Sequence, residues 1–180
     1  GSREELLYAR NDRFGNPALG IKDIVKPIAD TICLFGEKLS QENIYIFYME
    51  SYGGKITKGS KNYTSNGSTN ARLFDVAIIP VATVKQMLDE CSIEEIVSWR
   101  EHSTDRWQDV ETIKRYSSDV LFIDTVPYLK TVNSSSIPTD TKETFEWLKE
   151  YSDSIVALDP KALHKSEGGV IRPKDRKLIK

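Results

Sequence analysis

Three carboxylates stand where predicted strands end or run through apolar residues. Glu50 ends the apolar run 44–49, Asp75 lies inside the apolar run 72–79, and Glu167 directly precedes a glycine pair. A carboxylate in such a place is costly unless it is paired, hydrogen-bonded or bound to a metal ion. Each acid alone could cap a turn or pair with a nearby base. Because two of the three also lie close to glycine pairs, we interpret them together as a binding or catalytic site.

The glycine pair after Glu167 is Gly168-Gly169. Glycine weakens a strand interior, so a pair beside an acid indicates that another group approaches the backbone closely there. Basic residues in or beside predicted strands are suited to phosphate oxygens, which arginine binds as a two-pronged donor. The alternative is a solvated strand edge, where lysine guards against aggregation. The bases concerned are Arg10, Arg72, Arg172, Lys174, Lys177 and Lys180.

Composition predicts one soluble domain, or one domain with an insertion, without a membrane-spanning run. The chain has 180 residues, a formal charge of −2, 39% apolar and 29% charged residues. We expect Cys33 and Cys91 to be reduced, buried thiols in a cytoplasmic protein. The leading Gly-Ser is typical of an expression remnant, so the predicted domain covers 3–180. The two histidines have no metal-ligand spacing to the cysteines, and the sequence has no P-loop, G-x-G-x-x-G or G-x-S-x-G.

Hydrophobic patterning predicts an α+β fold with early strands and later helices. The predicted strands are 5–10, 44–49, 72–79, 119–123 and 169–172. Helical spacing runs from Ile21 to Phe35, and Ser92 with Glu95 forms a capping box for another helix. Asp105 with Gln108 is predicted to cap a further helix, and Asp140 with Glu143 is predicted to cap another. We interpret the tryptophans of residues 99–107 as packing residues rather than as a base-stacking platform.

Five segments together resemble the RNA ligases of the covalent nucleotidyltransferase superfamily, which also contains DNA ligases and mRNA capping enzymes. The match follows the family's motif order and covers nearly the whole chain. YMESYGGKI and SEGGVIRP are fairly specific in combination, whereas the other segments alone are weak. The segments are ARNDRFG (9–15), YMESYGGKI (48–56), RLFDVAI (72–78), SEGGVIRP (166–173) and KLIK (177–180).

The resemblance implies an ATP-grasp-like core of antiparallel sheets flanked by helices, which binds ATP with Mg²⁺ or Mn²⁺. It implies catalytic roles for Glu167, which would help to place the metal, and Lys180, which would neutralise the α-phosphate. It implies that Glu50 holds the ribose and that Phe74 stacks on adenine. The other nucleotide-binding residues that it implies are Arg10, Asp75, Gly168 and Arg172. Phosphoryl transfer relies mainly on such positioning and charge stabilisation.

The sequence departs from the family at the nucleophile. The family's lysine lies in K-x-(D/H)-G, and no lysine here has that pattern: Lys22 begins K-D-I-V and Lys58 begins K-G-S-K. Without it no covalent lysyl–AMP forms, so we expect this motif and the end of the last motif to lie outside these residues. The predicted function is ATP-dependent joining of RNA 5′-phosphate and 3′-hydroxyl ends by a monomer. The alternatives are a DNA ligase, a capping enzyme or a degenerate, non-catalytic nucleotide- or RNA-binding module.

Overall fold

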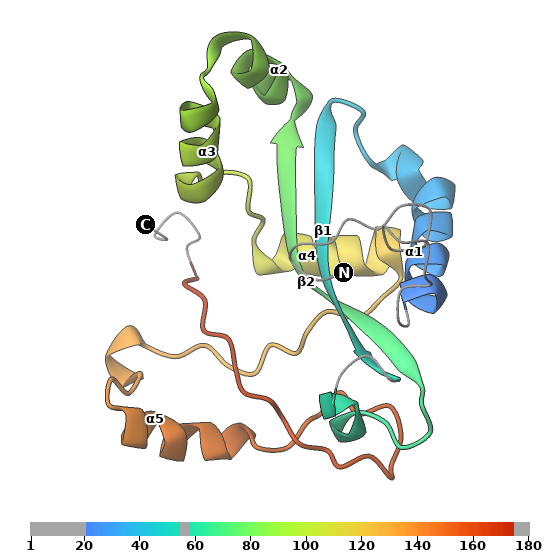
Figure 1. Ribbon diagram of the computed structural model, residues 1–180, viewed down its shortest axis with the longest axis vertical. Coiled ribbons are helices and arrows are strands. Elements are labelled where there is room, and N and C mark those ends of the chain that lie inside the picture. Colours follow the sequence, from blue (N-terminus) through green and yellow to red (C-terminus); the bar gives the residue numbers. More distant parts are fainter. Residues whose placement is uncertain (1–20, 55–57, 175–180) are drawn as a thin grey trace. The chain divides into compact units, whose positions relative to one another are not determined.

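The computed structural model describes residues 21–54 and 58–174, which form a mixed α+β structure as predicted (Figure 1). They divide into two compact units. The first unit contains residues 21–25, 51–54, 58–70 and 126–171, and the second contains residues 26–50, 71–125 and 172–174. The elements are α1 (Ile21–Phe35), β1 (Asn43–Gly53), β2 (Thr69–Pro80), α2 (Val81–Glu90), α3 (Ile93–His102), α4 (Val110–Tyr116) and α5 (Thr141–Leu148).

The second unit is built on the antiparallel pair of β1 and β2. Helix α4 crosses this pair (Figure 1), and its Tyr116 ring meets the rings of Tyr45 and Phe47 edge-on, each at 5.8 Å between centroids. The aromatic and β-branched run of β1 therefore packs as a strand, as predicted. The most deeply buried apolar side chains of the unit come from β2, α4 and the turn after α4, and they include Leu73, Val76, Ala77, Ile113, Val120 and Leu121.

Helix starts follow the predicted capping chemistry in two of three cases. The Ser92 hydroxyl accepts a hydrogen bond from the Glu95 backbone N–H, and the Glu95 carboxylate accepts one from the Ser92 N–H, so the predicted capping box is confirmed. Asp140 caps α5, also as predicted. The predicted cap of α4 is wrong because residue 107 pairs with β2 through a bridge to Ala77, which delays the helix until Asp109.

Two predicted strands are absent from the described residues. Residues 119–123 continue α4 as a π-helical turn, Ser117–Leu121, which buries Val120 and Leu121 and ends at a left-handed Phe122 with φ of 52°. A five-residue apolar run does not distinguish a buried strand from a buried helical turn. Residues 169–172 have no strand partner, and Val170 is 83% exposed. The predicted strand 5–10 lies outside the described residues.

The cysteine prediction is half right. Both thiols are free, but Cys33 and Cys91 are exposed rather than buried. Helix α1 buries Ile28. Cys33 lies five positions later and therefore points roughly 140° away from Ile28 around a helix of 3.6 residues per turn. Cys91 caps the end of α2, where its backbone N–H donates to the Met87 carbonyl. Apolar neighbours in sequence therefore did not place either thiol in the core.

Gly53 in the first unit has no room for a side chain. Its φ is +80°, and an added Cβ would lie 2.4 Å from the Ser68 carbonyl oxygen and 2.9 Å from Leu158 Cδ1. Gly53→Ala combines left-handed strain with a clash against backbone. We therefore expect it to lower the free energy of unfolding by about 2 kcal/mol, as measured by urea denaturation.

Gly67 supplies the matched control for this prediction. Its φ is +82°, but no atom lies within 4 Å of an added Cβ. Gly67→Ala should therefore introduce the backbone strain alone and lower the free energy of unfolding by about 1 kcal/mol. A Gly53→Ala variant no less stable than Gly67→Ala would show that the contact with residues 68 and 158 does not restrict this position.

Candidate functional site

The second unit brings together three of the predicted site residues. Arg172 Nη1 donates to the Phe74 carbonyl oxygen at 2.7 Å and lies 3.3 Å from Asp75 Oδ2. Its guanidinium carbon also lies 5.8 Å from the centre of the Phe74 ring. The two motifs that supply these residues lie almost a hundred positions apart in the sequence, and within the second unit the pairing attaches Arg172 to strand β2.

Asp75 is a positioning residue in this arrangement. Its side chain is 8% exposed, against 29% for Arg172. Its second oxygen, Oδ1, accepts from the Val76 backbone N–H at 3.0 Å. A carboxylate buried to this degree requires such partners. In this arrangement Asp75 holds the guanidinium of Arg172 over the strand, and a contact of Asp75 with a nucleotide stays a prediction.

Phe74 belongs to a cluster of half-buried rings on the strand pair. The ring of Tyr48 on β1 lies 6.1 Å from Phe74 and 5.3 Å from Trp107, in tilted geometries. All three rings are half-buried, unlike the sealed core of the unit. Each of these residues keeps part of its surface at solvent, and an aromatic ring is the kind of side chain on which a planar base stacks.

Glu50 and the glycines that follow it have separate roles. Glu50 is exposed and lies on β1. In the first unit, the groups close to Gly53 and Gly54 belong to residues 67–69 and 158 of the chain itself. The close approach of another group to the backbone, which the glycine pair predicts, is therefore explained at Gly53 and Gly54 by packing within the chain. The carboxylate of Glu50 is left at the surface, as a ribose-binding role would need.

The glycines after Glu167, unlike Gly53 and Gly54, have no protein group packed against them among the described residues. Glu167 and Gly168 are exposed, and the Ser166 hydroxyl accepts from the Gly168 N–H and donates to the Gly168 carbonyl, each at 3.2 Å. Gly168 has a φ of +136°, which favours glycine, yet no atom lies within 4 Å of an added Cβ there or at Gly169. No protein group among the described residues therefore occupies this space, and the backbone is open to a ligand.

The remaining predicted residues and the metal are only partly described. Arg10 and Lys180 lie outside the described residues. Within residues 21–54 and 58–174, no group of three His, Cys, Asp or Glu side chains is arranged to hold a metal ion. Mg²⁺ in nucleotide sites is commonly held by one or two carboxylates together with phosphate oxygens and water. Glu167, an exposed carboxylate beside open backbone, fits that mode and would be its ligand from this chain.

Two groups of polar and aromatic residues were not predicted from the sequence. In the first unit, the Asp159 carboxylate accepts from the Ser65 N–H and hydroxyl, each at 2.7 Å, and from the Thr64 hydroxyl at 3.1 Å. In the second unit, Arg106 lies over two indole rings. An aspartate-proline pair and a lone arginine carry no spacing signal, so only the fold reveals these contacts.

The hydrogen bonds from the Ser65 hydroxyl and N–H hold the pKa of Asp159 far below its ordinary value. A lowered pKa in the folded state means that the ionised carboxylate stabilises the fold above the unfolded pKa and that this effect is lost as the pH falls. The melting temperature of an Asp159→Ala variant should therefore lie below that of the unaltered chain at neutral pH, with the difference shrinking below about pH 4. Melting curves of both proteins across this range, with exposed Asp105→Ala as the control, test the prediction. A pH-independent difference would contradict it.

Comparison of the chain with protein-family models, with curated proteins and with solved structures gave no match. Within the part of the chain that the structure describes, every helix is too short or too polar to cross a bilayer.

Proposed function

We propose that this chain forms the nucleotide-binding core of an ATP-dependent RNA ligase. The main support is the pairing of Arg172 with Phe74 and Asp75, because it joins the RLFDVAI and SEGGVIRP segments at one place. Two motifs that would contact one nucleotide must meet in space, and chance resemblances have no reason to do so. The proposal includes an ATP-grasp-like arrangement as the finer description of the α+β fold.

The side chains have chemistry suited to these roles. Phe74 presents a half-buried ring for adenine, with the guanidinium of Arg172 fixed beside it. Glu50 of the second unit is exposed, as a ribose-binding role needs. Glu167 of the first unit is exposed too, and its role as a metal ligand rests on the resemblance alone. ATP, when bound, would supply the adenylyl group and a pyrophosphate leaving group. The protein's task is then to orient the nucleotide and to balance charge at the phosphates. RNA ends as partners, a monomeric state and a cytoplasmic location belong to the same proposal.

The missing K-x-(D/H)-G lysine favours one other function, a non-catalytic nucleotide- or RNA-binding module. Both functions require that the chain bind a nucleotide, but only the ligase forms a covalent adenylate in a protein that also contains the nucleophile. A DNA ligase or capping enzyme would share the covalent step and differ in the nucleotide or in the acceptor strand.

Calorimetric titration of the 180-residue chain with ATP, GTP and NAD, each with Mg²⁺, tests the proposal. We expect saturable binding with ATP preferred, and no protein-bound label from α-labelled ATP because the nucleophile motif is missing from this chain. Preference for GTP would favour a capping enzyme, and preference for NAD would favour a bacterial-type DNA ligase. Absence of binding by all three nucleotides, in protein shown to be folded by circular dichroism, would overturn the proposal.

A further inference from the structure

Two tryptophans and an arginine of the second unit form a stack. The guanidinium carbon of Arg106 lies 5.0 Å from the centre of the Trp99 ring and 5.1 Å from that of Trp107. A guanidinium over an indole is the strongest common cation–π arrangement. Arg106 also donates hydrogen bonds to the backbone carbonyls of Trp99 and Arg100 at the end of α3. These hydrogen bonds hold its guanidinium in place relative to the helix.

This stack continues into the proposed nucleotide site. The ring centroids of Trp107 and Tyr48 lie 5.3 Å apart, and those of Tyr48 and Phe74 lie 6.1 Å apart. The guanidinium carbon of Arg172 lies 5.8 Å from the centroid of the Phe74 ring. All six members belong to the second unit, and all are half-buried. We call this set the arginine–aromatic row: Trp99, Arg106, Trp107, Tyr48, Phe74 and Arg172.

The row differs from ordinary core packing. Core side chains of the same unit such as Leu73 and Val76 are fully buried, whereas each member of the row keeps part of its surface in contact with solvent. The rings of the Tyr48 contacts are tilted by 47° and 48°, so neighbouring rings do not cover each other face to face. Packing alone does not require two planar cations and four aromatic rings, joined by consecutive contacts, all to remain partly exposed.

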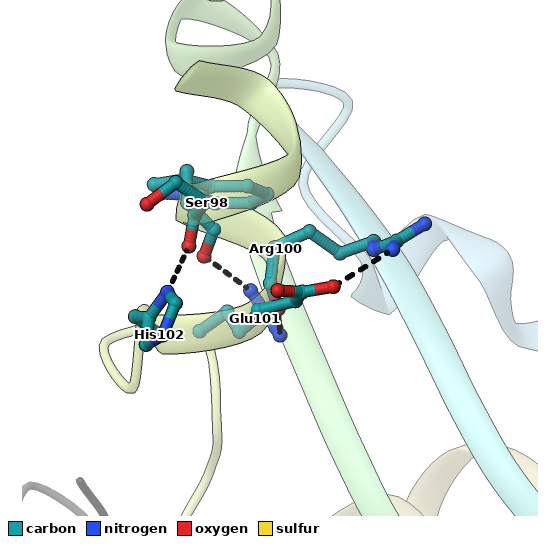
Figure 2. Close-up of polar contacts among 6 residues, drawn as sticks. Ser98, Arg100, Glu101 and His102 are labelled. Carbon is teal, nitrogen blue, oxygen red and sulfur yellow. Dashed lines mark hydrogen bonds and ion pairs between the residues drawn. The ribbon is translucent and has the colours of Figure 1, made fainter. Parts of the chain in front are cut away.

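The end of α3 places polar and charged side chains beside the row. Figure 2 shows that His102 turns back to the Ser98 carbonyl, at 2.9 Å from Nδ1, and that Arg100 pairs with Glu101 at 3.4 Å. The acids Glu94 and Glu95 lie at the opposite end of the helix, in its first turn. The last turn of α3 carries Arg100 with its paired Glu101, and the guanidinium of Arg106 lies close to this end of the helix. A guanidinium in this place suits a phosphate of an RNA backbone.

We propose that the arginine–aromatic row binds an unpaired RNA segment by stacking bases on its exposed ring surfaces. The choice of RNA rests on the proposed function, whereas the stacking rests on the row itself. Aromatic platforms interleaved with arginine are the usual means of holding single strands without sequence preference. Because the row ends at Phe74 and Arg172, it would lead an RNA strand toward the bound nucleotide. This role goes beyond the packing role predicted for the two tryptophans.

Tryptophan fluorescence gives a direct test. The chain has three tryptophans, and Trp147 lies on α5 in the first unit. In a Trp147→Phe variant of the full 180-residue chain, only Trp99 and Trp107 emit. We expect an unstructured single-stranded RNA of about 10 nucleotides to quench this emission on binding. Saturable binding by fluorescence anisotropy of labelled RNA, without any change in indole emission, would overturn the proposal.

Substitutions in the row give an independent test. Trp99→Leu should weaken RNA binding roughly 5- to 100-fold because it removes a stacking surface. Arg106→Lys keeps the charge but loses the planar group, and should weaken binding less. The matched control is Phe145→Leu, at an aromatic on α5 that is 69% exposed, and its RNA affinity should equal that of the unaltered chain. Unchanged RNA affinity in Trp99→Leu would overturn the proposal.

ATP titration separates this inference from the proposed function. Trp99→Leu should leave ATP affinity unchanged, because Trp99 lies at the end of the row away from Phe74. ATP binding without RNA-dependent quenching would overturn the proposal that the row binds RNA, and it would leave the ligase proposal intact. RNA-dependent quenching without binding of any nucleotide would support the row and contradict the ligase proposal.

Discussion

Asp75→Ala is expected to lower the free energy of unfolding of the second unit by about 3 kcal/mol. Removing one partner of a buried ion pair costs about 3–5 kcal/mol, because the other charge stays behind without its partner. The lower end applies here since the Arg172 side chain is still 29% exposed and is partly stabilised by water. Urea denaturation followed by Trp99 and Trp107 fluorescence in the Trp147→Phe background reports on this unit.

A double-mutant cycle identifies the cause of this loss. Asp75→Ala and Arg172→Ala should together cost about 1–2 kcal/mol less than the sum of the single variants. The pair Arg72–Asp124, at 3.2 Å, is a matched control, because Asp124 is 71% exposed and such pairs couple by at most about 1 kcal/mol. Equal coupling in the two cycles would show that Asp75 does not act mainly by holding Arg172.

Phe74→Leu is expected to weaken ATP binding roughly 5- to 100-fold. Leucine replaces much of the buried apolar volume but offers no π-surface for adenine, and stacking of a base on an aromatic ring contributes about 1–3 kcal/mol. Calorimetric titration of the folded variant measures the change. Phe74→Tyr, which keeps the ring, should bind ATP within about threefold of the unaltered chain.

Phe122 is the control for the loss of an aromatic ring in the same unit. It is 59% exposed and lies 4.8 Å from Phe35, outside the arginine–aromatic row. Phe122→Leu should leave ATP affinity unchanged. If Phe122→Leu and Phe74→Leu weaken ATP binding equally, the effect of the Phe74 change is a general one on the unit rather than the loss of a stacking surface.

The sequence predicted the elements whose signals are local. Apolar residues at helical spacing gave α1, and reciprocal hydrogen bonds between neighbouring residues gave the start of α3. Prediction from the sequence failed where a residue that is distant in the sequence determines the local structure. A bridge to Ala77 moves the start of α4 to Asp109, and burial of Val120 and Leu121 draws an apolar run into a helical turn. Such partners are not visible in a single window of sequence.

The candidate site was predictable in its members but not in its arrangement. Resemblance pointed to Phe74, Asp75 and Arg172 separately. It gave no sign that Asp75 would be buried against Arg172, because their contact spans 97 positions. The arginine–aromatic row was equally hidden, since its members come from two strands, a helix, the segment between α3 and α4, and the segment that holds Arg172.

Covalent labelling is the most direct test of the ligase proposal. The protein, together with any residues that its gene encodes before and after this sequence, is incubated with Mg²⁺ and α-labelled ATP and then denatured. We expect label that remains on the protein, that is lost in Glu167→Ala, and that is absent from the 180-residue chain without a K-x-(D/H)-G lysine. If the extended protein retains no label from ATP, GTP or NAD, the chain is not the core of a nucleotidyltransferase and the ligase proposal is wrong.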